Sequence, residues 1–184
     1  MTHNESTSET ELIHRIQNGD QKAMKIIYDK YVAYLTAVCS RYVVNFEDVR
    51  DILQNSFIKI FSSINKYKQQ ENASLKSWMT RIVVNDSLKF LKKNEHLKFL
   101  ESVETYPDIP SDEIETDCIP YVVMRQMISQ LPAGYRTVFN LFVFEKKSHK
   151  EIADMLGIKE NTSASQFFKA KKLLATKIKQ YQNE

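Results

Sequence analysis

The apolar positions between residues 20 and 42 follow the period of an α-helix. They recur three or four residues apart, which places their side chains on one helical face. Gly19 and Asp20 come directly before this run, and Asp20 is a residue type that caps helix N-termini. A shorter amphipathic segment, residues 11–17, precedes them. The buried face predicted for the longer helix comprises Met24, Ile27, Tyr28, Tyr31, Leu35, Val38 and Tyr42.

The same period predicts two more helices in the first half of the chain, separated by a polar loop at residues 65–72. One begins near Asn45, and its apolar face comprises Val49, Ile52, Leu53, Phe57, Ile60, Phe61 and Ile64. Its opposite face carries Glu47, Asp48, Asp51 and Gln54. The other runs from Ser74 to about Lys93, with an apolar face of Leu75, Trp78, Met79, Ile82, Val83 and Leu88.

Residues 94–120 interrupt the helical pattern. They contain three of the four prolines and eight acidic residues. Such a composition favours an extended, flexible linker. Helices are predicted to resume over residues 121–130, and Leu131 and Pro132 then break the pattern. Pro132 suits the first position of the next helix, which we expect to extend through Phe144.

The segment SHKEIADMLGIKENTSASQFFKAKKLL, residues 148–174, predicts a helix-turn-helix. Ser148 and Glu151 have the spacing of a capping box, and Gly157 stands where a helix ends in a left-handed residue. The short helix between them would bury Ile152, Ala153 and Leu156. Ile158 would be a buried turn residue.

A second helix, capped by Asn161 or Thr162, follows this turn. Its predicted buried face is Ser163, Phe167, Ala170 and Leu174. The remaining face carries Ala164, Ser165, Gln166, Lys169 and Lys172. A polar and basic second helix is typical of a reader of the DNA major groove, and the alternative is an ordinary helical hairpin.

Composition narrows the fold class. Only 3 glycines and 4 prolines occur among 184 residues, which disfavours a turn-rich β-architecture and predicts an all-α chain. No stretch approaches the roughly 20 apolar residues of a membrane span, and the polar N-terminus lacks the features of a signal peptide. We therefore expect a cytoplasmic protein without membrane insertion. Cys39 and Cys118 form no metal-ligand or disulfide pattern, and Cys39 fits the helical core.

Charge divides the chain into three blocks. Residues 1–94 hold 14 basic and 10 acidic residues, residues 95–120 hold 1 and 8, and residues 121–184 hold 11 and 5. Two basic blocks favour contact with a polyanion, although solvated helical faces give the same counts. Together with the helix pattern they predict two small helical domains, residues 1–94 and 121–184, joined by an acidic linker at 95–120.

Three segments in this order resemble a known family. EDVRDILQNSF at residues 47–57, SLKSWMTRIVVN at residues 74–85 and the helix-turn-helix resemble the extracytoplasmic-function group of bacterial RNA polymerase sigma factors, group 4 of the sigma-70 family. The resemblance spans about residues 10–180. Two positions depart from the family pattern. Asn55 replaces a usual Glu, and Ala164 stands where a basic residue is common.

The resemblance implies three contact regions. A polymerase-binding region would comprise Asp48, Asp51, Gln54 and Phe57. It would dock on the β′ subunit of the core enzyme, and the β subunit is a further expected partner. A region reading the promoter −10 element would comprise Arg81, Asn85, Lys89, Lys92 and Lys93. A region reading the −35 element would comprise Thr162, Ser165, Gln166, Lys169, Lys171 and Lys172. Phe57 and Trp78 also fit their helices' apolar faces, and packing is the stronger interpretation for both.

The remaining expectations concern function class. The resemblance implies promoter DNA, core RNA polymerase and an anti-sigma factor as partners, and by position it implies that the acidic linker enters the nucleic-acid path of the polymerase. A solvated spacer is the alternative for that linker. The four histidines are scattered, and the sequence lacks a phosphate loop or nucleophile motif, so we expect no enzyme activity, cofactor or metal. The alternative function is a two-domain helix-turn-helix regulator that does not bind the polymerase core.

Overall fold

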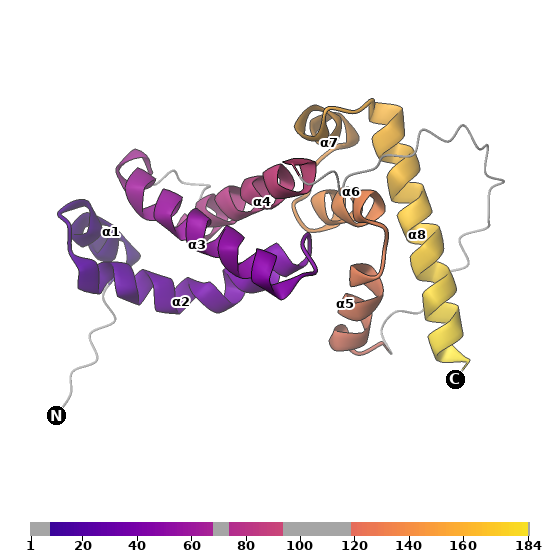
Figure 1. Ribbon diagram of the computed structural model, residues 1–184, viewed down its shortest axis with the longest axis horizontal. Helices are drawn as coiled ribbons and strands as arrows, with labels where there is room; N and C mark the ends of the chain where they lie inside the picture. Colours follow the sequence, from indigo (N-terminus) through magenta and orange to yellow (C-terminus); the bar gives the residue numbers. More distant parts are fainter. Residues whose placement is uncertain (1–7, 68–73, 94–118, 184) are drawn as a thin grey trace. The chain divides into compact units, whose positions relative to one another are not determined.

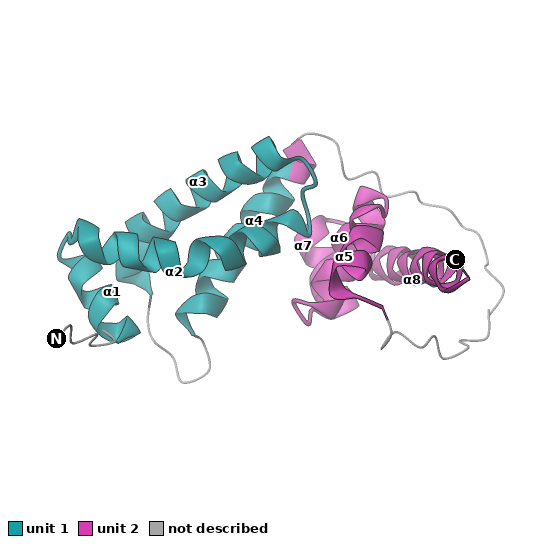
Figure 2. Ribbon diagram, turned by 90° about the horizontal axis from the view of Figure 1, so that it is seen from below, with its two compact units in different colours: residues 1–90 teal, residues 91–184 magenta. Residues whose placement is uncertain are grey.

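The protein is described here from a computed structural model, which covers residues 8–67, 74–93 and 119–183. The described residues form eight α-helices and one short 3₁₀ helix, and no strand occurs among them. The chain divides into two compact units, residues 1–90 and 91–184 (Figure 2). The predicted linker at 95–120 falls almost entirely outside the described residues, as do residues 68–72 of the loop predicted at 65–72.

The first unit is built from the helices that periodicity predicted. They are α1 (Glu9–Gln17), α2 (Gln21–Ser40), α3 (Phe46–Ser63) and α4 (Leu75–Lys93), with the 3₁₀ helix η1 (Ile64–Lys66) after α3 (Figure 1). The last three residues of α4 lie beyond the boundary of this unit. The Asp20 side chain caps α2 by accepting from the backbone N–H groups of Lys22 and Ala23. The Asn45 side chain caps α3 in the same way. The predicted N-cap Asp20 is confirmed, and the helix predicted to begin near Asn45 is capped by that residue; each cap satisfies backbone donors that the helix leaves unpaired.

The core of the first unit lies between α2, α3 and α4. Its fully covered side chains include Ile27, Leu35, Tyr42, Ile60 and Met79. Cys39 is fully buried as predicted, and burial raises the pKa of its thiol. Tyr28 departs from the prediction, since it is 43% exposed at the edge of the packed face.

A buried carboxylate joins α3 to α4. Asp86 of α4 is 9% exposed, and it accepts hydrogen bonds from the Ser56 hydroxyl at 2.9 Å and the Lys59 ammonium at 2.6 Å. Ser56 is fully buried, whereas about half of the Lys59 side chain stays in solvent. A charge removed from water is tolerated only when it is paired and hydrogen-bonded, and this pair of donors meets that need. The two donors therefore fix how α4 is rotated on α3.

The second unit contains α5 (Tyr121–Ser129), α6 (Ala133–Val143), α7 (His149–Leu156) and α8 (Glu160–Gln182). One end of α8 packs against α5, and the shared apolar cluster consists of Met127, Ile128, Leu131, Ala170, Leu174 and Ile178.

A buried guanidinium stabilises the connection between α5 and α6. Arg136 donates from Nη1 to the carbonyl oxygens of Ser129 and Leu131, each at 2.9 Å, and burial lowers the pKa of Arg136. Pro132 is the N-cap of α6 and Ala133 begins it, one residue later than predicted.

The helix-turn-helix is present, with its first helix as predicted. Ser148 and Glu151 form a complete capping box at the start of α7, and Gly157 ends that helix at φ 72°. Ile152, Ala153 and Leu156 are buried, while Ile158 is only half-buried rather than buried. The predicted cap of α8 is wrong. Lys159, in extended backbone, is the N-cap without a side-chain bond, and Asn161 and Thr162 already belong to the first turn.

The link between α3 and α4 gives a prediction for stability. Replacing Asp86 by Ala leaves the buried Ser56 hydroxyl without its acceptor, and we expect the unfolding free energy of the first unit to fall by about 2 kcal/mol. Trp78 is the protein's single tryptophan and lies in α4, so its fluorescence during urea unfolding reports on this unit. The control is Asp29→Ala, which removes an exposed ion pair with Lys25 and should cost no more than about 0.5 kcal/mol. Equal losses in the two variants would contradict a structural role for Asp86.

The capping box gives a prediction for acid sensitivity. The Lys147 ammonium and the Ser148 backbone and hydroxyl donate to the Glu151 carboxylate, and they hold its pKa at about 2 against an ordinary 4.5. A depressed pKa in the folded state means that this carboxylate stabilises the fold above pH 4.5 and loses its effect as the pH falls toward 2. The melting temperature of Glu151→Gln should therefore lie below that of the parent near neutral pH and converge with it in acid.

The Glu151 titration itself is measurable by carbon NMR of the side-chain carboxyl. We expect a midpoint near 2 in the parent protein and a higher midpoint in Ser148→Ala, which removes one of the donors. An ordinary midpoint in the parent would show that the capping box does not form in solution.

Candidate protein and nucleic-acid interfaces

The exposed face of α3 carries an acidic and amide stripe. Glu47, Asp51, Gln54 and Ile58 recur at the helical period and are all exposed, while Asp48 beside them is half-buried. Glu47 forms an exposed ion pair with Arg50 at 3.2 Å. The Asp51 and Gln54 side chains predicted to bind a partner are therefore presented together to solvent.

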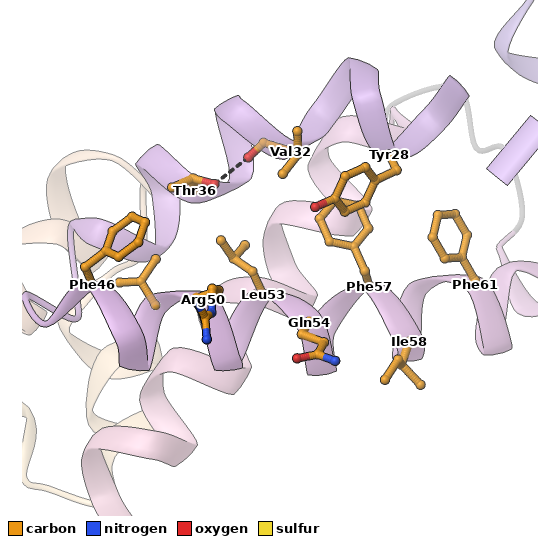
Figure 3. Close-up of a pocket in the computed structure, with 11 residues that line it drawn as sticks. Tyr28, Val32, Thr36, Phe46, Arg50, Leu53, Gln54, Phe57, Ile58 and Phe61 are labelled. Atoms are coloured by element: carbon orange, nitrogen blue, oxygen red, sulfur yellow. Dashed lines mark hydrogen bonds between the residues drawn. The ribbon is translucent and has the colours of Figure 1, made fainter. Parts of the chain in front are cut away.

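An apolar groove of about 500 Å³ lies beside this stripe, between α2 and α3 (Figure 3). Phe46 and Ile58 are 69% and 61% exposed at its margin. Large apolar side chains exposed next to a groove are typical of a docking surface for another protein. The remaining lining residues are Tyr28, Val32, Thr36, Val49, Arg50, Leu53, Gln54, Phe57 and Phe61.

Phe57 belongs to the packed face of α3. It is 5% exposed, and its ring lies 4.6 Å from the Tyr28 ring and 5.9 Å from the Phe61 ring, measured between centroids. Figure 3 shows Phe57 directed toward α2, with Gln54 and Ile58 on the other side of α3. Packing, the stronger interpretation of Phe57 in the sequence, is confirmed, and the ring contributes to the groove only by forming part of its wall.

The exposed face of α4 collects the residues predicted to bind nucleic acid. Arg81, Asn85, Lys89, Lys92 and Lys93 are all exposed, and their spacing places them along one side of the helix. The Asp86 carboxylate, next to Asn85 in the chain, points into the protein instead. This face therefore offers cationic groups and one amide, which suit phosphates and a base edge.

Trp78 is half-buried, and its ring packs 5.4 Å from the ring of Tyr67. The packing interpretation from the sequence is therefore supported, because the indole is engaged with a neighbouring ring of its own unit.

The N-terminal part of α8 is fixed by an aromatic cluster. The His149 ring stacks on Phe142 with centroids 4.7 Å apart, and Phe142 lies 4.4 Å from Phe167 of α8. The His149 Nδ1 and the Ser163 hydroxyl form a hydrogen bond of 3.0 Å between α7 and α8. Side chains of α6, α7 and α8 thus pack together at the N-terminal part of α8.

The residues predicted to read the −35 element do not all share one open face. Ser165 and Lys171 are exposed, and Thr162 and Lys172 are half-buried. Gln166 is 1% exposed and Lys169 is 7% exposed, so the expectation that both lie on the open face is wrong. Gln166 lies three residues after Ser163 and four before Ala170, both fully buried, which places it at the edge of the packed stripe.

Sequence reasoning missed two apolar members of the groove, Phe46 and Ile58. Ile58 stands on the polar stripe of α3, whereas Phe46 lies three residues before Val49 and continues the predicted apolar face into the first turn. An apolar residue on an otherwise polar face was the signal that could have revealed Ile58 as a surface residue of the groove.

Among the described residues, no group of three or more His, Cys, Asp or Glu is placed to hold a metal ion. Within the same residues, no helix combines the length and apolarity required to cross a membrane.

Comparison with known proteins assigns both units. Residues 27–96 match the family model for sigma-70 region 2, and residues 121–174 match the model for sigma-70 region 4. The first match contains α3 and α4 with their exposed faces, and the second contains the helix-turn-helix. The alternative of a regulator without a polymerase-binding part is not favoured, because the first unit also has a counterpart in sigma factors.

Two sigma factors of similar length, one from Haemophilus influenzae and one from Bacillus subtilis, support this assignment. The chain is 27% identical to the ECF RNA polymerase sigma-E factor of Haemophilus influenzae, covering 95% of this chain and 97% of that one. It is 29% identical to the RNA polymerase sigma factor SigV of Bacillus subtilis, covering 74% and 80%. A solved complex of the sigma factor RpoE with the anti-sigma factor NepR from Bartonella quintana aligns at 19% identity and a TM-score of 0.49, covering 86% and 98%. The chain belongs to the sigma-70 family of bacterial RNA polymerase sigma factors, in its extracytoplasmic-function group.

Proposed function

We propose that this sigma factor binds core RNA polymerase through the stripe and groove of α3, and reads a promoter through α4 and α8. Residues 1–94 would form the domain that binds the polymerase and the −10 element. Residues 121–184 would form the domain that reads the −35 element. The observation that carries the proposal is the groove of α2 and α3, lined by exposed Phe46, Ile58 and Gln54. The exposed Asp51 lies on the same stripe of α3 as Gln54 and Ile58. A surface that combines apolar anchors with an acidic rim fits a helical partner whose polar face is basic.

The −10 element would be held by the exposed face of α4. Asn85 has an amide that both donates and accepts, so it suits the Watson–Crick edge of a base that has left the stack. Arg81 and Lys89 flank it at four-residue spacing and would hold the phosphates on either side. Lys92 and Lys93 extend the same charge to the end of the helix.

The −35 element would be read by the open face of α8, with Thr162 and Ser165 near the bases and Lys171 and Lys172 on phosphates. Gln166 and Lys169 are left out of this contact set, because the structure buries both. An anti-sigma factor is a further partner that we propose, and the groove of α3 is a surface that such a partner would need to cover. The protein would act in the cytoplasm as a specificity subunit, without catalysing a reaction itself.

Binding to core polymerase tests the proposal. Asp51→Arg combined with Gln54→Ala reverses the charge at position 51 and removes the net negative charge of the stripe without touching buried side chains, and we expect at least about a tenfold loss of affinity. Size-exclusion chromatography with purified bacterial core polymerase measures it, with the parent protein co-eluting. The control is Asp154→Arg combined with Gln180→Ala, which makes the same changes at exposed sites of the second unit. Failure of the folded parent to co-elute would contradict the proposed function.

Promoter opening tests the role of Asn85. Asn85→Ala should leave polymerase binding unchanged and reduce open complexes on duplex promoter DNA about tenfold, because the captured base loses its partner. Permanganate reactivity of unpaired thymines measures the opened fraction. Asn65→Ala, an exposed asparagine of η1, is the matched control. Unchanged opening by Asn85→Ala would remove this residue from the −10 contact.

A further inference from the structure

The open stripe of α8 differs from the face expected from sequence. Asn161, Ala164 and Ser165 are exposed and recur at three- and four-residue spacing. Successive helical residues are turned by about 100°, which places these three opposite the packed stripe of Ser163, Ala170 and Leu174. They occupy the first two turns of the helix, the part of a recognition helix that reaches base edges.

This stripe contains no group suited to guanine. The first nine residues of α8, Glu160–Phe168, include neither lysine nor arginine, and residues 137–184 contain no arginine at all. A guanine offers two acceptors, O6 and N7, and the strongest side-chain partners for them are Arg and Lys. Lys159 precedes the helix as its N-cap, and Lys169 within the helix is buried. Lys171 and Lys172 lie a turn or more beyond the stripe, where contact with phosphates is the expected role.

The groups that are present suit adenine and thymine. The amide of Asn161 can donate to adenine N7 and accept from adenine N6. The methyl group of Ala164 matches the C5-methyl group of thymine, which is apolar. The Ser165 hydroxyl already donates to the Asn161 carbonyl oxygen at 2.8 Å, so toward DNA it can only accept.

Glu160 is the one residue of this turn with a preference for cytosine, since a carboxylate accepts from the cytosine amino group. By helical geometry it is turned about 90° from the centre of the stripe, toward the packed side. Its charge also opposes approach to phosphates.

We propose that α8 selects a −35 element made of A·T pairs, with Asn161 on an adenine and Ala164 against a thymine methyl group. This inference rests on the proposed sigma-factor function and adds the class of sequence that the second unit recognises. Discrimination comes from one amide and one methyl contact, while the lysines supply affinity that does not depend on sequence.

The test uses the full chain bound to bacterial core polymerase. The templates are duplex DNA with short randomised windows at the −35 and −10 positions, and the sequences of templates yielding transcripts are counted. We expect A·T pairs to be enriched in the −35 window, with about tenfold discrimination against G·C at the best position. Asn161→Ala should abolish the preference at one position, and Ala164→Arg should introduce a guanine preference at a neighbouring one.

Asn183→Ala, at the far end of α8, is the matched control and should leave the selected sequences unchanged. Equal melting temperatures and equal co-elution with polymerase show that each variant still folds and assembles. Enrichment of G·C pairs by the parent, or no preference in the −35 window, would overturn the inference while leaving the sigma-factor function intact. Absence of transcripts from every template would overturn the proposed function and the inference with it.

Discussion

The first unit depends on the buried Asp86 carboxylate and its two donors on α3. Asp86 follows Asn85, so the contact that fixes one side of α4 also fixes the direction in which the amide of Asn85 points. On α3 the donors Ser56 and Lys59 alternate with the exposed residues Gln54 and Ile58. The two proposed working surfaces of this unit are thus the outer faces of helices whose inner faces share one hydrogen-bonded charge. A change at Asp86 would disturb both surfaces without touching either partner.

The second unit fixes its working helix by a different chemistry. Rings from α6, α7 and α8 pack around Phe167, and the His149–Ser163 hydrogen bond spans the turn. The left-handed Gly157 allows α7 to end abruptly, so that α8 can begin three residues later. Aromatic packing is less directional than the hydrogen bonds to the Asp86 carboxylate, whereas the capped turn constrains the backbone tightly. Together they hold the start of α8 while leaving Asn161 and Ala164 open.

Local rules were enough for most of the fold. Apolar periodicity located α2, α3 and α4, and the caps at Asp20 and Ser148 could be predicted because each lies directly before an amphipathic run. The start of α8 was mispredicted, since a side-chain cap was assumed where the backbone of Lys159 alone begins the helix. The groove beside Phe46 required knowledge of how α2 and α3 pair, which no local pattern contains. The pattern of polar and apolar residues likewise could not show that Gln166 is buried, because glutamine is a polar residue.

Both proposed DNA-reading surfaces offer few groups that can recognise a base, and this explains why a sigma factor needs the polymerase. The outer face of α4 offers one amide among cations, and the first two turns of α8 offer one amide and one methyl group. Lysine lacks the forked geometry that reads guanine at two atoms, and lysines outnumber arginines 20 to 6. Each unit alone would therefore bind DNA weakly and with little discrimination. If the enzyme fixes the spacing of the two units, the second contact becomes intramolecular, and two weak preferences multiply into a usable one.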